Sequence, residues 1–173
     1  MQQNPLQLRF ATTHLATGLR LNYAEQGDPT GEAIIFLHGY SDSWFSFSRV
    51  LPFLSPVYHA FALTERGHGD SDKPECCYTL DDFADDVDAF MDAVGIEEAT
   101  LVGHSGGTLI AARAVLSYPQ CVRRLVLFGA AIMGANNEQM LGLQRLAVML
   151  HHPAPGGARM GMVVIENLRV ERR

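Results

Sequence analysis

The sequence predicts an α/β fold in which a doubly wound, mostly parallel sheet carries helices on both faces. The first observation is a set of continuously apolar runs of strand length, a pattern typical of strands that are covered on both sides. These runs span residues 33–37, 58–63, 99–103 and 122–128. The second observation is that helical patterns, at 80–94 and 107–118, alternate with these strands. Such alternation is typical of parallel sheets.

The composition is that of an ordinary globular domain. A length of 173 residues is enough for one domain with its own core, and an apolar content of 47% excludes a disordered chain. The net charge of −6 argues against a nucleic-acid partner, because a phosphate backbone attracts basic surfaces. The first residues lack the pattern of a signal peptide, and no window is apolar for long enough to span a bilayer. We therefore expect a cytoplasmic protein without a membrane partner.

The three cysteines predict neither a metal site nor a disulfide framework. Cys76, Cys77 and Cys121 are an odd number without the spacing of metal ligands. Cys76 and Cys77 are adjacent and would pair with each other only under strain. We expect reduced thiols, as in cytosolic proteins, and no metal or cofactor.

The chain begins with two segments of alternating polarity. Residues 6–11 and 19–24 alternate apolar and polar side chains, which predicts an antiparallel pair of strands at a sheet edge. The central strand at 33–37 then ends in the sharp turn His38-Gly39-Tyr40. Asp42 or Ser43 can cap a short helix after this turn, which Pro52 would kink or shorten.

The clearest helix lies at residues 80–94. Its apolar side chains recur on one face, Thr79 is a good N-cap, and Gly95 suits the position after the helix. Six aspartates between Asp81 and Asp92 form an acidic run. Paired carboxylates can hold a metal or serve acid–base chemistry, but we expect this run to be a solvated helix face.

The most informative stretch follows the strand at 99–103. It is Gly103-His104-Ser105-Gly106-Gly107, a Gly-x-Ser-x-Gly pattern that leads directly into the helix at 107–118. A strand, a tight turn and a helix in this order hold a serine in a strained conformation as an exposed nucleophile. The glycines on either side remove Cβ atoms that would clash in such a turn.

With this turn, the His38-Gly39-Tyr40 turn and the polar loop from Arg66 to Ser71, the sequence resembles the α/β-hydrolase family over residues 6–134. It looks closest to small bacterial esterases and haloperoxidase-like hydrolases. The resemblance implies that Ser105 is the nucleophile and that the backbone N–H groups of Tyr40 and Gly106 form an oxyanion hole. It also implies supporting roles in the two turns for His38, Gly39, Gly103, His104 and Gly107. Each oxyanion donor is typically worth about 10²–10³ in rate.

The resemblance further implies an acid and a histidine that follow the serine along the chain. No strand followed by an aspartate and no Gly-His pair occurs after residue 134. Glu138, His151 and His152 are the remaining candidates for acid and base. We therefore expect a C-terminally truncated hydrolase core at 1–134. Residues 135–173 would hold the start of a cap-like helix and a divergent tail, a helix or a frayed end, rather than a second domain.

Truncation would leave the strand at 122–128 as an exposed apolar edge, which invites self-association. Two functions remain open. The first is a serine hydrolase that acts on a small ester-type substrate without a cofactor. The second is a non-catalytic fragment or ligand-binding protein that keeps the fold without the chemistry.

Overall fold

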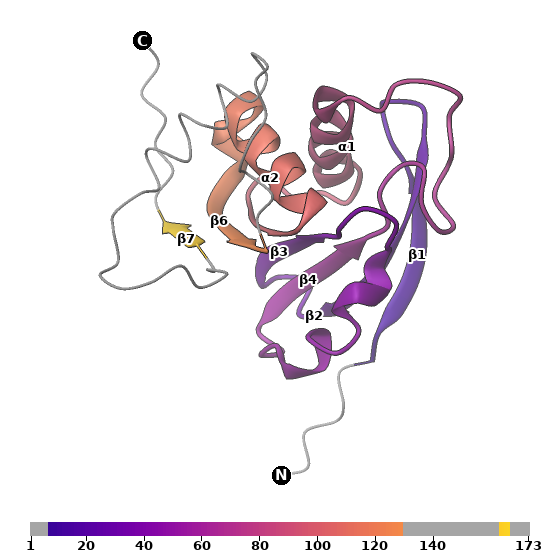
Figure 1. Ribbon diagram of the computed structural model, residues 1–173. Helices are drawn as coiled ribbons and strands as arrows, with labels where there is room; N and C mark the ends of the chain where they lie inside the picture. The colour runs from indigo at the N-terminus through magenta and orange to yellow at the C-terminus, as the bar shows by residue number, and fades with distance from the viewer. Residues whose placement is uncertain (1–6, 130–162, 167–173) are drawn as a thin grey trace.

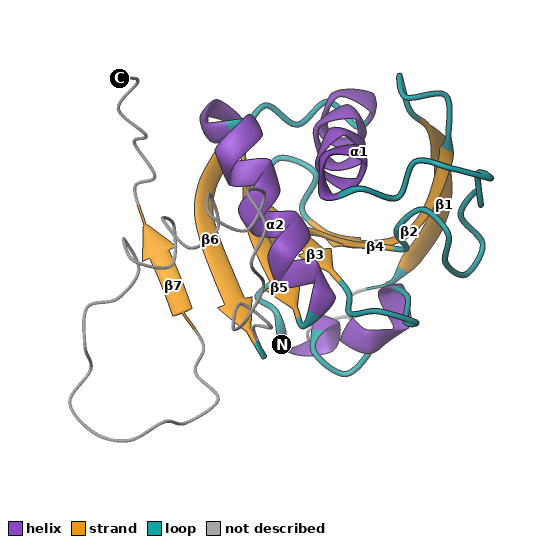
Figure 2. Cartoon of the chain, turned by 45° about the horizontal axis from the view of Figure 1, so that its top comes forward, coloured by secondary structure: helices purple, strands orange, loops and turns teal. Residues whose placement is uncertain are grey.

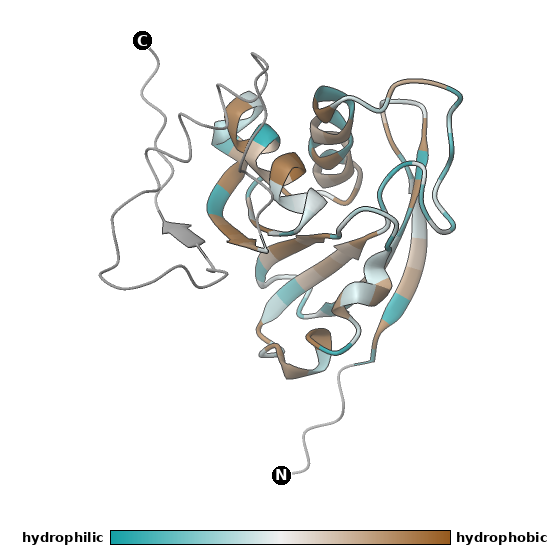
Figure 3. Ribbon diagram, in the orientation of Figure 1, coloured by the Kyte–Doolittle hydropathy of each residue, from teal (hydrophilic) through white to brown (hydrophobic). Residues whose placement is uncertain are grey.

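The computed structural model describes residues 7–129 and 163–166, which form a seven-stranded sheet with the order β1-β2-β4-β3-β5-β6-β7 (Figure 1). Hydrophobic residues run along the central strands and along the helices that cover them (Figure 3). The strands are β1 (Arg9–His14), β2 (Arg20–Gly27), β3 (Glu32–Leu37), β4 (Tyr58–Leu63), β5 (Ala99–His104), β6 (Val122–Phe128) and β7 (Val163–Glu166).

The centre of the sheet is parallel and its margins are antiparallel. Strand β3 pairs in parallel with both β4 and β5, and β5 pairs in parallel with β6. Strands β1 and β2 form an antiparallel pair beside β4, as the alternating segments predict. The first strand begins at Arg9 rather than at residue 6. The predicted α/β class with a mostly parallel sheet is confirmed.

Two α-helices, α1 (Leu80–Ala93) and α2 (Gly106–Ser117), pack side by side on one face of the sheet (Figure 2). Within residues 7–129, the opposite face is covered by two short 3-10 helices, Trp44–Phe47 and Leu51–Phe53, and not by an α-helix. The single helix expected after residue 43 is therefore wrong. Pro52 opens the second 3-10 helix because it lacks an N–H and cannot continue a longer one.

The N-terminus of α1 is built as predicted, but its acidic run is not a solvated face. Thr79 and Asp82 form a reciprocal capping box, and Gly95 follows with a positive φ of 73°. Asp86, however, is only 3% exposed and makes a two-pronged ion pair with Arg66 at 2.6 and 2.7 Å. Asp81, Asp85 and Asp88 contact Arg113, Tyr118 and Cys121. The run joins α1 to its neighbours because partners from distant segments face it.

The edge expected at β6 is not open. Strand β7 pairs antiparallel with it, from Arg124 opposite Glu166 to Leu127 opposite Val163. A strand at 163–166 was not predicted, because four residues are too few to show a period. Self-association stays a prediction, but the pairing removes the bare 124–127 edge on which it was based. The domain division at 134 lies outside the described residues.

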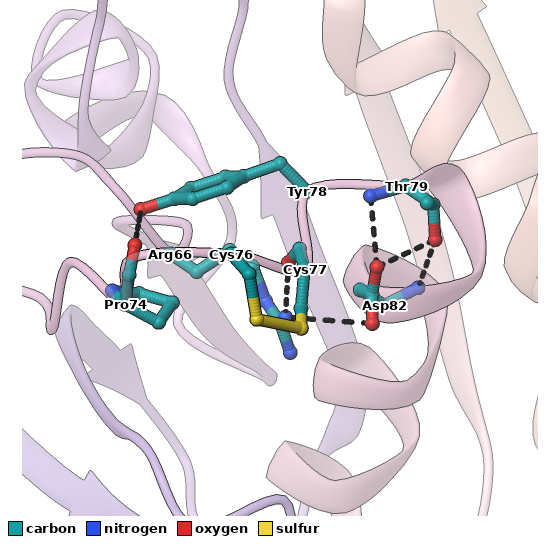
Figure 4. The surroundings of a disulfide bond; sticks show 7 residues. All are labelled: Arg66, Pro74, Cys76, Cys77, Tyr78, Thr79 and Asp82. Carbon is teal, nitrogen blue, oxygen red and sulfur yellow. Dashed lines mark hydrogen bonds and ion pairs between the residues drawn. A yellow bond between two sulfur atoms is a disulfide. The ribbon is translucent and has the colours of Figure 1, made fainter.

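The loop between β4 and α1 holds a disulfide between adjacent cysteines, Cys76 and Cys77 (Figure 4). The expectation of reduced thiols at these two positions is therefore wrong. Cys77 adopts a positive φ of 72°, a conformation that the sequence did not suggest for a cysteine. Its carbonyl accepts a hydrogen bond from Arg66 Nη1 at 2.5 Å, which joins the loop to the Arg66–Asp86 pair. Cys121 is a free, half-buried thiol.

None of the helices in the described part of the chain is both long and apolar enough to cross a membrane.

Candidate active site

Ser105 occupies the turn between β5 and α2. Strand β5 ends at His104 and α2 begins at Gly106, so Ser105 is the only residue between them. Its φ of 50° and ψ of −114° lie where residues with a side chain are rarely found, at a cost of about 1–3 kcal/mol. The surrounding fold holds this conformation through the Ser105 N–H, which donates to Phe128 O at 3.1 Å.

Two glycines make the sharp turn sterically possible. A Cβ at Gly103 would lie 2.5 Å from Gly107 O, and one at Gly107 would lie 2.2 Å from Leu37 O. Both contacts are with backbone atoms, which cannot move aside as a flexible side chain can. Gly103 and Gly107 are therefore required for the steric reason that the sequence pattern predicted, since a side chain at either position would strike the backbone.

The His38-Gly39-Tyr40 turn lies directly against this serine. A Cβ at Gly39 would lie 3.1 Å from Ser105 Cβ, and one at Gly106 would lie 3.2 Å from Tyr40 N. Gly106 is the first residue of α2, where backbone N–H groups have no partner within the helix and the helix dipole is positive. The backbone amides of Tyr40 and Gly106 therefore lie next to each other, beside Ser105.

His38 fixes the direction of the Tyr40 amide. Its Nε2 accepts the Glu65 N–H at 3.0 Å, so the ring carries its proton on Nδ1. Nδ1 then donates to Gly39 O at 2.7 Å. The Gly39–Tyr40 peptide is trans, so its N–H points away from its carbonyl and hence away from the His38 ring.

Burial disfavours the charged forms of the two titratable groups behind this turn. The His38 side chain is fully buried, and this burial lowers its pKa to about 4, against the smaller opposing effect of its bond to Gly39. Burial likewise raises the pKa of the Glu65 carboxyl well above its usual range. At neutral pH the His38 imidazole behind the turn is therefore neutral, and burial favours the protonated form of the Glu65 carboxyl group.

No histidine or carboxylate within residues 7–129 hydrogen-bonds Ser105 Oγ. The His104 ring stacks on Phe128, with 4.8 Å between ring centroids, and both nitrogens of His38 have partners. Glu138, His151 and His152 lie outside the described residues.

One group of possible metal ligands occurs in the described part of the chain, namely His38, Glu65 and His68. Their ligand atoms lie within 4.8 Å of one another. His38 would have to break one of its two hydrogen bonds to bind a metal, and His68 Nδ1 already contacts Arg66 O at 2.9 Å. The group therefore fits a hydrogen-bonded support better than a metal site.

Sequence reasoning did not single out Glu65 or Ser71 as parts of this support. Ser71 Oγ donates to Thr64 O at 2.5 Å and accepts the Asn22 N–H at 2.9 Å, which fixes the backbone before Glu65. The available signal in the sequence was a glutamate two residues after an apolar strand and just before a glycine-rich loop.

The family model described as "alpha/beta hydrolase fold" matches residues 32–154. The chain belongs to the alpha/beta hydrolase fold family. Epoxide hydrolase 3 of Mus musculus is 32% identical over 139 residues, which cover 79% of this chain and 35% of that protein. The 2-(acetamidomethylene)succinate hydrolase of Mesorhizobium japonicum is 36% identical over 108 residues, which cover 62% of this chain and 38% of that protein.

Solved structures of this family show the same fold. Epoxide hydrolase VrEH1 from Vigna radiata matches with a TM-score of 0.68 and 28% identity, over 76% of this chain and 41% of that structure. The meta-cleavage product hydrolase CumD matches with a TM-score of 0.65 and 33% identity, over 69% of this chain and 45% of that structure. This alpha/beta hydrolase chain spans about a quarter to two fifths of the length of the curated relatives that it matches.

Proposed function

We propose that this alpha/beta hydrolase chain carries the nucleophile and the oxyanion hole of a serine hydrolase that acts on small acyl-ester substrates. The observation that supports this most is the contact between the two turns. A strained, half-buried Ser105 lies against a turn whose Tyr40 amide is aimed away from His38. This arrangement supports the proposal of a nucleophile beside preorganised hydrogen-bond donors.

The reaction would take two steps. Ser105 Oγ attacks the substrate carbonyl carbon, the carbonyl π electrons move onto its oxygen, and the Tyr40 and Gly106 amides donate to that oxyanion. Collapse expels the alcohol, which receives the proton that the serine lost, and leaves an acyl-enzyme ester. Water attacks this ester through a second oxyanion and releases the acid and free Ser105. A general base must carry the protons; His151 and His152 remain its sequence candidates, and Glu138 remains the candidate for the acid.

The names of several relatives suggest epoxide hydrolysis as a second candidate function. The residue type at position 105 favours an acyl substrate. A serine oxygen that opened an epoxide would form an ether, which water does not readily hydrolyse, so the enzyme would stay blocked. A serine ester formed from an acyl group is hydrolysed through the same oxyanion hole.

A non-catalytic, ligand-binding protein is the third candidate. The described residues that surround Ser105 Oγ include no base, and a serine without a base is a weak nucleophile at neutral pH. This candidate keeps the fold and the turns but predicts no covalent chemistry at Ser105.

Reaction with a fluorophosphonate probe separates these candidates. We expect one phosphonyl adduct on the intact protein, mapped by mass spectrometry to Ser105 and absent in Ser105→Ala. Ser117→Ala, which alters an exposed serine at the end of α2, is the matched control and should react like the unaltered chain. A protein that remains folded and forms no adduct supports the non-catalytic candidate. In a separate turnover assay, hydrolysis of an epoxide but not of an ester supports epoxide hydrolysis.

A further inference from the structure

A buried carboxyl group lies behind the oxyanion turn with one oxygen unpaired. The Glu65 side chain is 8% exposed, and its Oε1 has no hydrogen-bond partner among the described residues. Leaving a buried acceptor unpaired costs about 1–3 kcal/mol. An apolar residue would avoid this cost, so the carboxyl group needs an explanation.

The other oxygen of Glu65 lies close to the hydrogen bond that orients the turn. Oε2 is 3.7 Å from His38 Nδ1, while Gly39 O is 2.7 Å from the same nitrogen. The Nδ1–H therefore has two possible acceptors. A neutral carboxyl group competes weakly with the carbonyl, whereas a carboxylate is a much stronger acceptor.

We propose that Glu65 is a positioning residue for the oxyanion turn, and that its ionisation draws the His38 Nδ1–H away from Gly39 O. The carboxyl proton leaves to solvent and no covalent bond is formed or broken elsewhere. Once its carbonyl is released, the Gly39–Tyr40 peptide can rotate, and the Tyr40 N–H no longer faces Ser105. The catalytic consequence of this change rests on the proposed function, but the change in the His38 hydrogen bond does not.

The charged and titratable neighbours of Glu65 come from three segments. His38 begins the turn after β3, and His68 lies on the loop of Glu65 after β4, with its ring 4.9 Å from that of His38. Asp42, from the segment after the same turn, has a small electrostatic effect that raises the His38 pKa. Arg66 does not neutralise Glu65, because its guanidinium pairs with Asp86 on α1. Burial raises the pKa of the Glu65 carboxyl, so the change falls at a pH above the usual carboxyl range.

The test compares Glu65→Gln, which cannot ionise, with Glu75→Gln, which alters an exposed glutamate of the same loop. Two quantities are measured across pH on the full chain. One is the rate of fluorophosphonate reaction at Ser105, and the other is the set of ¹⁵N shifts of the His38 ring. If one oxyanion donor is lost, the rate of the unaltered chain relative to Glu65→Gln should fall by about 10²-fold as Glu65 ionises. The His38 Nδ1 shift should change over the same pH range in the unaltered chain and in Glu75→Gln only.

A His38 ring signal that changes equally in Glu65→Gln would overturn the proposal, as would a rate ratio that stays constant with pH. If Ser105 reacts in no variant at any pH, the proposed function fails, and the ¹⁵N measurement still decides the role of Glu65. Glu65→Met, an apolar residue of similar length, replaces Glu65→Gln if that variant does not fold. It should show the same pH-independent His38 signal.

Discussion

The two turns that meet at Ser105 are stabilised in different ways. The Gly103–Gly107 turn is determined by local sterics, because glycines four residues apart remove atoms that would strike the backbone. The His38–Tyr40 turn depends on a hydrogen bond that the backbone N–H of Glu65, 27 residues later in the sequence, donates to His38 Nε2. The first turn is therefore sensitive to added atoms, and the second to lost hydrogen bonds and to protons.

The largest expected effect is on the serine turn. In Gly107→Ala the new Cβ would lie 2.2 Å from Leu37 O, so we expect a loss of about 3 kcal/mol or more in the free energy of unfolding. Gly106→Ala is the control, since its Cβ meets Tyr40 N at 3.2 Å and the position is the first of a helix. Urea unfolding monitored by circular dichroism measures both. Equal stabilities of the two variants would contradict a steric origin of the turn.

A smaller effect is expected from the loop that supports the oxyanion turn. Asp86→Asn removes the carboxylate of the two-pronged ion pair, but Asp82 Oδ1 still lies 3.8 Å from Arg66 Nη1, so we expect a loss of about 1–3 kcal/mol in the free energy of unfolding. Asp92→Asn, at an exposed position of the same helix, should change stability by less than about 0.5 kcal/mol. The same unfolding experiment applies. A loss in Asp86→Asn no larger than in Asp92→Asn would show that the loop does not need this pair.

The smallest effect is a pH dependence confined to the oxyanion turn. Burial lowers the His38 pKa from 6.5 to about 4, so its contribution to stability is lost as pH falls through that range. Burial raises the Glu65 pKa, so its contribution is lost as pH rises above the unfolded value, about 4.3. His38 makes the free energy of unfolding rise with pH and Glu65 makes it fall, so the two effects oppose each other where their pH ranges overlap. Each changes the free energy of unfolding by at most about 1.4 kcal/mol per pH unit.

Glu65→Gln removes one of these opposing slopes. Its free energy of unfolding should therefore rise more steeply with pH above about 4.3 than that of the unaltered chain, by at most about 1.4 kcal/mol per pH unit. Denaturant unfolding at a series of pH values measures this difference. Parallel curves for the two proteins would mean that Glu65 does not remain protonated in the folded state.

Much of the fold could be predicted because its signals are local. Apolar runs predicted the central strands, and the period of the helix at 80–94, with Thr79 and Gly95 at its ends, predicted α1 nearly to the residue. Partners supplied by distant segments could not be predicted in this way. Asp86 is buried because Arg66 reaches it, and β7 is a strand because β6 lies beside it.

The same distinction holds for the candidate site. The strained serine and its glycines follow from five consecutive residues, whereas the support of the oxyanion turn requires Glu65, Ser71 and Asn22 to meet in three dimensions. The disulfide between Cys76 and Cys77 was missed because a left-handed cysteine has no signal in the sequence.

The central claim is that the two turns together form one oxyanion hole at Ser105. Amide ¹H–¹⁵N spectra of the phosphonylated protein, compared with the free protein, test it most directly. A phosphonyl oxygen at Ser105 should shift the Tyr40 and Gly106 amide protons downfield more than any others, because both would donate to it. An adduct on Ser105 that leaves the Tyr40 amide unshifted, or the absence of any adduct, would contradict the account.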